Sequence, residues 1–275
     1  VCCSDSKVLG AVNDQVPQAD GVLVLINDPV YGGAGGFNYA TSYTDGRTGE
    51  QVAAHEVGHS LVGLWDEYSY GYSTDRGDGP NCAIGDAHWE QWLDESDVGA
   101  FQVCSYTNYL RPTDDGCMMR NLRDDYCPVC REQAVLAIYD KLPSLLLSWE
   151  PQEDEVTLPG SFSVQALGPD EGGLDLIWSI DGEEVARGAQ VDLACQRGEE
   201  LTVTVHDPTP WVRLDERGLL TDERSWTLSP CVLDSADTGE PVPRPRPECG
   251  CAQALDAPSM GLLTALLLAL TRFRV

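Results

Sequence analysis

Hydrophobic residues follow two different spacings along the first half of the chain. Residues 21–27 contain the continuous run Val-Leu-Val-Leu-Ile, which is typical of a central strand buried on both faces. We expect residues 38–44 to form an edge strand. Residues 50–64 contain no proline and space their apolar side chains as a helix does, and a second apolar helix is predicted over residues 131–147, interrupted at Pro143. These elements predict an α+β (α/β-like) domain.

We assign residues 1–148 to this first domain. The chain begins at Val1 without an initiator methionine, so we expect it to be truncated at the N-terminus. Residues 31–37 are rich in glycine but lack the Lys and Ser/Thr of a phosphate-binding loop, which predicts a turn or a cleft rim. Residues 66–115 form a long polar segment, and loops of this length are usually functional or disordered.

The pattern changes to short β-like runs over residues 149–232. An Asp181-Gly182 pair predicts a hairpin turn, Trp178 is a candidate core residue, and Cys195 with Cys231 is a candidate disulfide. We therefore expect an all-β sandwich of the immunoglobulin-like kind with a structural role. Its predicted strands are residues 161–166, 174–180, 190–193 and 201–206.

The end of the chain has a different composition. Residues 233–250 are rich in proline and predict a semi-rigid linker, and residues 251–275 contain an apolar run that is shorter than a standard membrane span of about 20 residues. The order Cys249-Gly-Cys251, apolar run, Arg272 and Arg274 resembles the C-terminal sorting tail of myxobacterial surface proteins. This resemblance implies a hydrophobic tail helix that holds the precursor in the membrane, and hence an exported protein at the cell surface or outside the cell.

Charge and length limit the classes of partner. The 275 residues, of which 42% are hydrophobic, suit two modest domains with a core in each. The net charge of −28 disfavours nucleic acid and anionic membrane as partners and favours neutral or basic proteins. The sequence gives no indication of the oligomeric state.

Eleven cysteines indicate either disulfides in an oxidising compartment or bound metal. A four-thiolate zinc site needs a second C-x-x-C pair besides Cys127 and Cys130, and we identify none. We therefore expect disulfides that brace the loops around the candidate active site, with the pairing open and with Cys2 or Cys3 as further candidates. The cysteines expected to take part are Cys82, Cys104, Cys117, Cys127 and Cys130.

The chemistry is concentrated in residues 55–59, His-Glu-Val-Gly-His. On a helix, positions i and i+4 lie one turn apart on the same face, so His55 and His59 can bind one zinc ion. A zinc ion with two or three protein ligands keeps a position for water, and Glu56 is placed to take the proton of that water. This pattern predicts a hydrolytic zinc site with Glu56 as the catalytic residue.

Asp66 is the first candidate for a third zinc ligand. On a straight helix it would lie roughly 10 Å beyond His59, so the chain must turn, and Gly63 can adopt the left-handed conformation that such a turn needs. Glu67 is adjacent to Asp66 and stays an alternative. Further alternatives are His88, Glu90 and Glu95.

Residues 55–68 read HEVGHSLVGLWDEY, which resembles the HExxH…GxxDEY zinc signature of the IgA-peptidase family of bacterial metallopeptidases. The segment is also similar to metzincins, although Gly63 falls one place later and Asp66 stands in place of the third histidine. The resemblance extends over about residues 21–147. It implies a metzincin-like fold and a methionine turn at Cys117-Met118-Met119, with either methionine beneath the metal.

We thus predict an exported zinc endopeptidase that acts on protein or peptide substrates. Its metal would be held by His55, His59 and Asp66, and its general base would be Glu56. The alternative is a non-catalytic surface binding or adhesion protein with a structural zinc site.

Overall fold

The computed structural model describes residues 3–230 except residues 37, 45 and 170–172. The predicted linker and tail helix, residues 233–275, lie outside the described residues. Within the described part of the chain, no helix is both long enough and apolar enough to cross a membrane.

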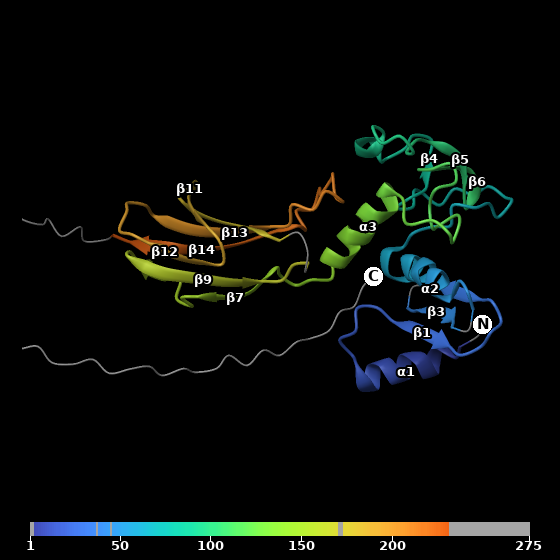
Figure 1. Cartoon of the computed structure of the whole chain (residues 1–275), viewed down its shortest axis with the longest axis horizontal. Coiled ribbons are helices and arrows are strands. Elements are labelled where there is room, and N and C mark those ends of the chain that lie inside the picture. The colour runs from blue at the N-terminus through green and yellow to red at the C-terminus, as the bar shows by residue number, and fades with distance from the viewer. Residues whose placement is uncertain (1–2, 37, 45, 170–172, 231–275) are drawn as a thin grey trace, which may run out of the picture. The chain divides into compact units, whose positions relative to one another are not determined.

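The first sheet has the strand order β1-β3-β2, and helix α1 (Asp5–Gln15) precedes it (Figure 1). Strand β1 (Leu23–Ile26) pairs parallel with β3 (Ala40–Tyr43), and β2 (Gly33–Gly35) pairs antiparallel with β3. The predicted roles of two strands are therefore wrong, because β1 lies at the edge and β3 at the centre.

Side-chain hydrogen bonds explain why β3, and not β1, is the central strand. All four residues of β3 are buried, whereas Leu25 of β1 is 61% exposed. Ser42 Oγ donates to the carbonyl of Gly49 at 2.9 Å, and Thr41 Oγ1 donates to the carbonyl of Ala34 at 3.2 Å. Because both hydroxyls have partners, a polar strand is stable at the centre of this sheet.

Helix α2 (Gly49–Val57) continues as one π-helical turn, η1 (Gly58–Val62), and ends at Gly63. Gly63 has a φ of 79°, so the predicted left-handed turn is confirmed. The amide of Leu64 donates to the carbonyl of Gly58 at 3.0 Å and closes the turn.

Helix α3 (Pro128–Tyr139) begins earlier and ends earlier than the predicted helix over residues 131–147. Pro128 occupies the first turn, where the missing amide hydrogen costs nothing. Beyond Pro143, the amides of Leu145 and Leu146 donate to the Asp222 carboxylate, which holds this segment extended at the start of strand β7 (Leu146–Glu150).

The long polar segment after Asp66 contains ordered structure. Strands β4 (Ala83–Ile84), β5 (Phe101–Cys104) and β6 (Tyr106–Arg111) form a small sheet in the order β4-β6-β5, and a short 3-10 helix, η2 (Glu90–Trp92), lies between β4 and β5. Cys82 and Cys104 form a disulfide within this region.

Two further sheets enclose one core that contains Trp178 and Trp226, whose rings stack with centroids 5.7 Å apart. One sheet has the order β11-β10-β13-β14-β8 and the other β12-β9-β7. Asp181 and Gly182 both have positive φ, so the predicted hairpin turn is confirmed. The strands are β7 (Leu146–Glu150), β8 (Glu155–Thr157), β9 (Gly160–Ala166), β10 (Asp175–Ile180), β11 (Glu183–Arg187), β12 (Gln190–Leu193), β13 (Glu200–His206) and β14 (Thr221–Ser229).

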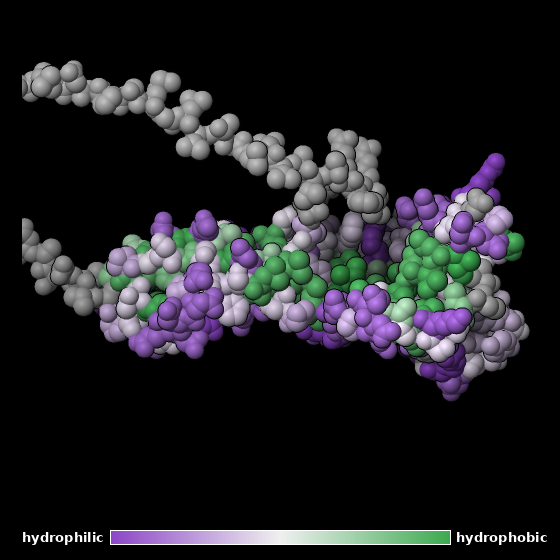
Figure 2. Space-filling view, turned by 90° about the horizontal axis from the view of Figure 1, so that it is seen from below, coloured by the Kyte–Doolittle hydropathy of each residue, from purple (hydrophilic) through white to green (hydrophobic). Residues whose placement is uncertain are grey.

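Cys195 is disulfide-bonded, and Cys231, its expected partner, lies outside the described residues. The four strands predicted for this region are present with small changes at their ends, and β7, β8, β11 and β14 were not predicted. On the face of the molecule shown in Figure 2, hydrophobic residues gather in separate areas between hydrophilic ones.

Replacing Trp178 by alanine tests the core of the two enclosing sheets. Trp178 is fully buried and its indole N–H donates to the carbonyl of Gly188 at 2.9 Å. We expect Trp178→Ala to lower the free energy of unfolding by about 3–5 kcal/mol, measured by chemical denaturation. Trp211, which is 50% exposed, is the matched control, and Trp211→Ala should cost less than about 1 kcal/mol. Equal effects of the two substitutions would contradict the described core.

Candidate metal centre

The helix α2 and the π turn η1 place His55 and His59 side by side. Their Nε2 atoms lie 3.1 Å apart. The Nδ1 atom of His55 lies 3.0 Å from the carbonyl of Met118, and that of His59 lies 2.6 Å from the carbonyl of Leu64. Because a carbonyl only accepts, each Nδ1 carries the hydrogen, and each neutral ring turns the lone pair of its Nε2 toward the same point.

The turn at Gly63 brings Asp66 to this point. Its Oδ1 lies 3.0 Å from His55 Nε2 and 3.2 Å from His59 Nε2. The other carboxylate oxygen accepts a hydrogen bond from the Tyr70 hydroxyl, and Ser105 Oγ donates to the Asp66 backbone carbonyl at 2.7 Å. Asp66 is thus held from three sides.

These three atoms fit a bound metal ion. They lie 3.0–3.2 Å from one another, and a tetrahedral zinc ion with bonds of about 2.0–2.1 Å would separate its ligands by about 3.3 Å. Two imidazole lone pairs and a carboxylate repel one another at this distance unless a cation or a proton lies between them. The electrostatics of the centre therefore favour a cation.

The protonation of the metal-free centre follows the same logic. Burial alone would raise the pKa of Asp66, but hydrogen bonds from His55, His59 and Tyr70 outweigh it and hold this pKa well below its usual range. Burial opposes a charge on His59, yet the hydrogen bond and the charge of Asp66 raise the pKa of His59. A proton on His59 is therefore favoured when no metal is bound, and a metal ion that binds here must displace it.

Glu56 is partly buried beside the two histidines. Burial raises the pKa of Glu56, and the neighbouring imidazoles and a hydrogen bond from the backbone of Gly35 act against this. Strand β2 packs directly on the helix here, since a Cβ atom on Gly35 would lie 2.4 Å from the Glu56 carbonyl and 2.6 Å from His59 Cβ. The glycine-rich segment, predicted as a turn or a cleft rim, forms this strand beside Glu56.

Met119 is the methionine that lies against the helix formed by α2 and η1. It is fully buried, and its Sδ would lie 3.2 Å from a Cβ atom on Gly58. Met118 contributes only its carbonyl, which orients His55. The Tyr126 hydroxyl donates to the carbonyl of Ala54 at 2.5 Å and supports the helix from the same side.

The alternative third ligands lie elsewhere. Glu67 belongs to a separate buried group with three cysteines. His88 is exposed and its Nε2 lies 3.2 Å from the carbonyl of Pro80, Glu90 is exposed, and Glu95 accepts a hydrogen bond from Arg213. Of the residues predicted from the sequence, the structure brings together His55, His59 and Asp66.

The sequence alone does not identify Tyr70 or the two carbonyls that orient the histidines. Tyr70 is one of three tyrosines at alternate positions with Tyr68 and Tyr72, and nothing in the spacing distinguishes it from the other two. The carbonyls of Leu64 and Met118 belong to the backbone, so no residue type marks them.

Residues 2–80 match the family described as IgA Peptidase M64. The match includes His55, Glu56, His59 and Asp66 and confirms the resemblance to this family of peptidases over that part of the chain. It ends before the predicted methionine turn. Among the curated proteins, none matches the chain.

Removing the Asp66 carboxylate tests the third ligand. We expect Asp66→Ala to lower the zinc affinity of this centre by more than about 100-fold, since even the loss of a residue that only supports a ligand costs about 10–100-fold. The affinity is measured by competition with a chromophoric chelator. His88→Ala is the control and should keep the wild-type affinity, because His88 lies outside the centre. Undiminished zinc binding by Asp66→Ala would remove Asp66 from the ligand set.

Proposed function

From the match of residues 2–80 to the IgA-peptidase family, we propose that the protein is a zinc endopeptidase that hydrolyses peptide bonds of protein substrates. The observation that carries the proposal is the convergence of His55 Nε2, His59 Nε2 and Asp66 Oδ1 next to Glu56. The side chain of His59 is 17% exposed and Glu56 is only partly buried, so water and substrate have access.

Zinc is the metal that suits two imidazoles and one carboxylate, and when bound it supplies Lewis-acid activation of water and of the peptide carbonyl. Glu56 acts as the general base that accepts a proton from the attacking water and then passes it to the leaving amine. The carbonyls of Met118 and Leu64 keep the two imidazoles in one tautomer, and Tyr70 and Ser105 keep Asp66 in position.

The substrate would bind in extended form along β2. This strand is at the end of the order β1-β3-β2, so its outer edge is available for pairing, whereas β3, which we expected to be the edge strand, is central. Pairing with an edge strand uses backbone hydrogen bonds, and Gly35 on β2 contacts both Glu56 and His59. The scissile bond would thereby lie over the metal centre.

The finer fold assignments belong to the same proposal. The position of Met119 against α2 and η1 supports a metzincin-like catalytic domain. The two sheets around Trp178 and Trp226 support an immunoglobulin-like second domain. The boundary near residue 148 stays a prediction.

We also propose that the protein is exported. The Cys82–Cys104 disulfide and the disulfide-bonded Cys195 support an oxidising compartment. The sorting tail and contact with a membrane through residues 251–275 stay part of this proposal. The non-catalytic alternative is disfavoured because Glu56 adds a general base that a structural metal site does not need.

The substitution Glu56→Gln separates catalysis from metal binding. We expect the variant to keep its zinc and to lose about 10²–10⁴-fold in kcat/KM on an unfolded protein substrate, because the amide cannot accept the proton. Glu50→Gln, an exposed position in the first turn of the same helix, is the matched control and should keep full activity. If the wild-type chain, supplied with any missing N-terminal residues, cleaves nothing in a broad peptide library, the protein is not a peptidase.

A methyl group on Gly35 tests the role of β2. The close contacts with Glu56 and His59 leave no room for a Cβ atom, so Gly35→Ala displaces the strand from α2 and η1. We expect kcat/KM to fall by up to about 100-fold with zinc retained, as for a displacement of about 1 Å near the reacting groups. Gly36→Ala is the control, because a Cβ atom there meets nothing within 4 Å. Equal kinetics of the two variants would contradict a role of β2 in substrate binding.

A further inference from the structure

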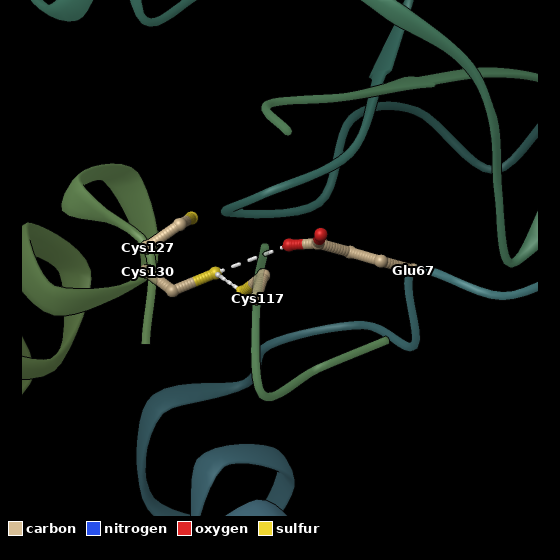
Figure 3. A group of neighbouring side chains, drawn as sticks. All are labelled: Glu67, Cys117, Cys127 and Cys130. Atoms are coloured by element: carbon tan, nitrogen blue, oxygen red, sulfur yellow. Dashed lines mark hydrogen bonds between the residues drawn. The ribbon is translucent and has the colours of Figure 1, made fainter. Parts of the chain in front are cut away.

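Three thiols and one carboxylate form a second group next to the candidate metal centre. Glu67, Cys117, Cys127 and Cys130 are all buried, and one ligand atom from each lies within 4.8 Å of the others. Figure 3 shows the side chains pointing toward one another from three separate segments of the chain.

We propose that these four residues, which we call the Cys3Glu site, bind a structural zinc ion. The proposal does not rest on the peptidase function, because none of the four residues belongs to the group formed by His55, His59 and Asp66. Thiolates select zinc among the common divalent metals of proteins, and four protein ligands leave no position for water, which is the mark of a structural site.

The distances fit joint coordination. Cys117 Sγ lies 3.6 Å from Cys130 Sγ, and Cys130 Sγ lies 3.3 Å from Glu67 Oε1. Tetrahedral zinc with bonds of about 2.3 Å to sulfur and about 2.1 Å to oxygen separates two sulfurs by about 3.8 Å and a sulfur from an oxygen by about 3.6 Å. The sulfur atoms of a disulfide lie only about 2.05 Å apart. The disulfide expected of Cys82 and Cys104 is present, whereas Cys117, Cys127 and Cys130 are free, so the expectation that these three cysteines form disulfides is wrong.

The Glu67 carboxylate supplies an independent indication of a cation. The side chain is fully buried, and its Oε2 has no hydrogen-bond partner among the described residues. Its Oε1 accepts a hydrogen bond from the side-chain amide of Asn81 at 3.1 Å, and no ion pair within the described ranges includes this carboxylate. A buried carboxylate without a counter-charge is costly, and a metal ion at the Cys3Glu site would supply that charge.

The start of α3 presents two of the thiols. Cys127 is the residue that precedes the helix, and Cys130 lies in its first turn after Pro128. Amide groups at a helix N-terminus stabilise the thiolate form that binds a metal. The C-x-x-C spacing is that of many structural zinc sites.

The Cys3Glu site would also hold the candidate active site in place. Glu67 follows Asp66 directly, and the amide of Glu67 donates to the carbonyl of Met119 at 2.9 Å. Cys117 precedes Met118, whose carbonyl orients His55. One zinc ion would thereby connect the loop that carries Asp66, the methionine segment and α3.

Metal counting and cobalt spectroscopy on the full chain test this proposal. Wild type should bind two zinc ions per chain, one at each group, and the variant His55→Ala/His59→Ala should keep one. With Co²⁺ in place of zinc, this variant should show a strong near-ultraviolet thiolate-to-cobalt band, because only the Cys3Glu site contains sulfur ligands. Adding Cys117→Ser to this variant should abolish the band, and adding Cys3→Ser, a free cysteine outside the site, should leave it unchanged.

Two results would overturn the proposal. One is a disulfide between any two of the three cysteines, detected by mass spectrometry after alkylation of the denatured chain. The other is a His55→Ala/His59→Ala variant that binds no zinc and gives no thiolate band while its three thiols are reduced. Because this variant keeps every residue of the Cys3Glu site, unfolding of the cysteine variants would not obscure the answer.

Discussion

The arrangement around the candidate metal centre depends on three acceptor atoms whose mutual repulsion is relieved by a bound cation or, without one, by a proton. His55 Nε2, His59 Nε2 and Asp66 Oδ1 lie within about 3 Å of one another because backbone carbonyls hold the opposite side of each imidazole. Without these two carbonyls the rings would be free to turn their lone pairs away from the carboxylate. The π turn and the left-handed Gly63 place the carbonyl of Leu64 against His59 and turn the chain so that Asp66 lies at the two histidines. The end of the helix therefore determines the electrostatics of the centre.

The adjacent residues Asp66 and Glu67 belong to two different groups of side chains. Asp66 is directed toward the two histidines, whereas Glu67 is directed toward the three cysteines. Asn81 orients the dipeptide: its side-chain oxygen accepts from the amide of Trp65 at 2.8 Å, and its amide donates to the carbonyl of Trp65 and to Glu67. A single peptide unit therefore connects the two groups.

Local features of the chain were predictable, and features that depend on distant segments were not. The histidine pair, Gly63 and Asp66 lie within twelve residues, so helix geometry sufficed to place them. The Cys3Glu site was not predictable because its four residues come from three segments of the chain, and the position of Glu67 beside Asp66 makes it a candidate for the other centre. The centre and the edge of the first sheet were exchanged because hydrophobicity favoured β1, while the hydrogen bonds of Thr41 and Ser42 that stabilise β3 leave no mark in the pattern.

The glycines of β2 would limit how this strand pairs with the proposed peptide substrate. Gly33 and Gly35 have no side chains because Val52, Glu56 and His59 occupy the space that a Cβ atom would need. In an extended pairing, β2 would therefore offer a peptide its backbone groups with almost no side chains of its own, and backbone pairing is largely independent of sequence. Any selectivity of the proposed peptidase for particular side chains would then come from other walls of the site. Tyr68 and Tyr72 are 44% and 57% exposed near Asp66 and Tyr70, and they present aromatic surface there.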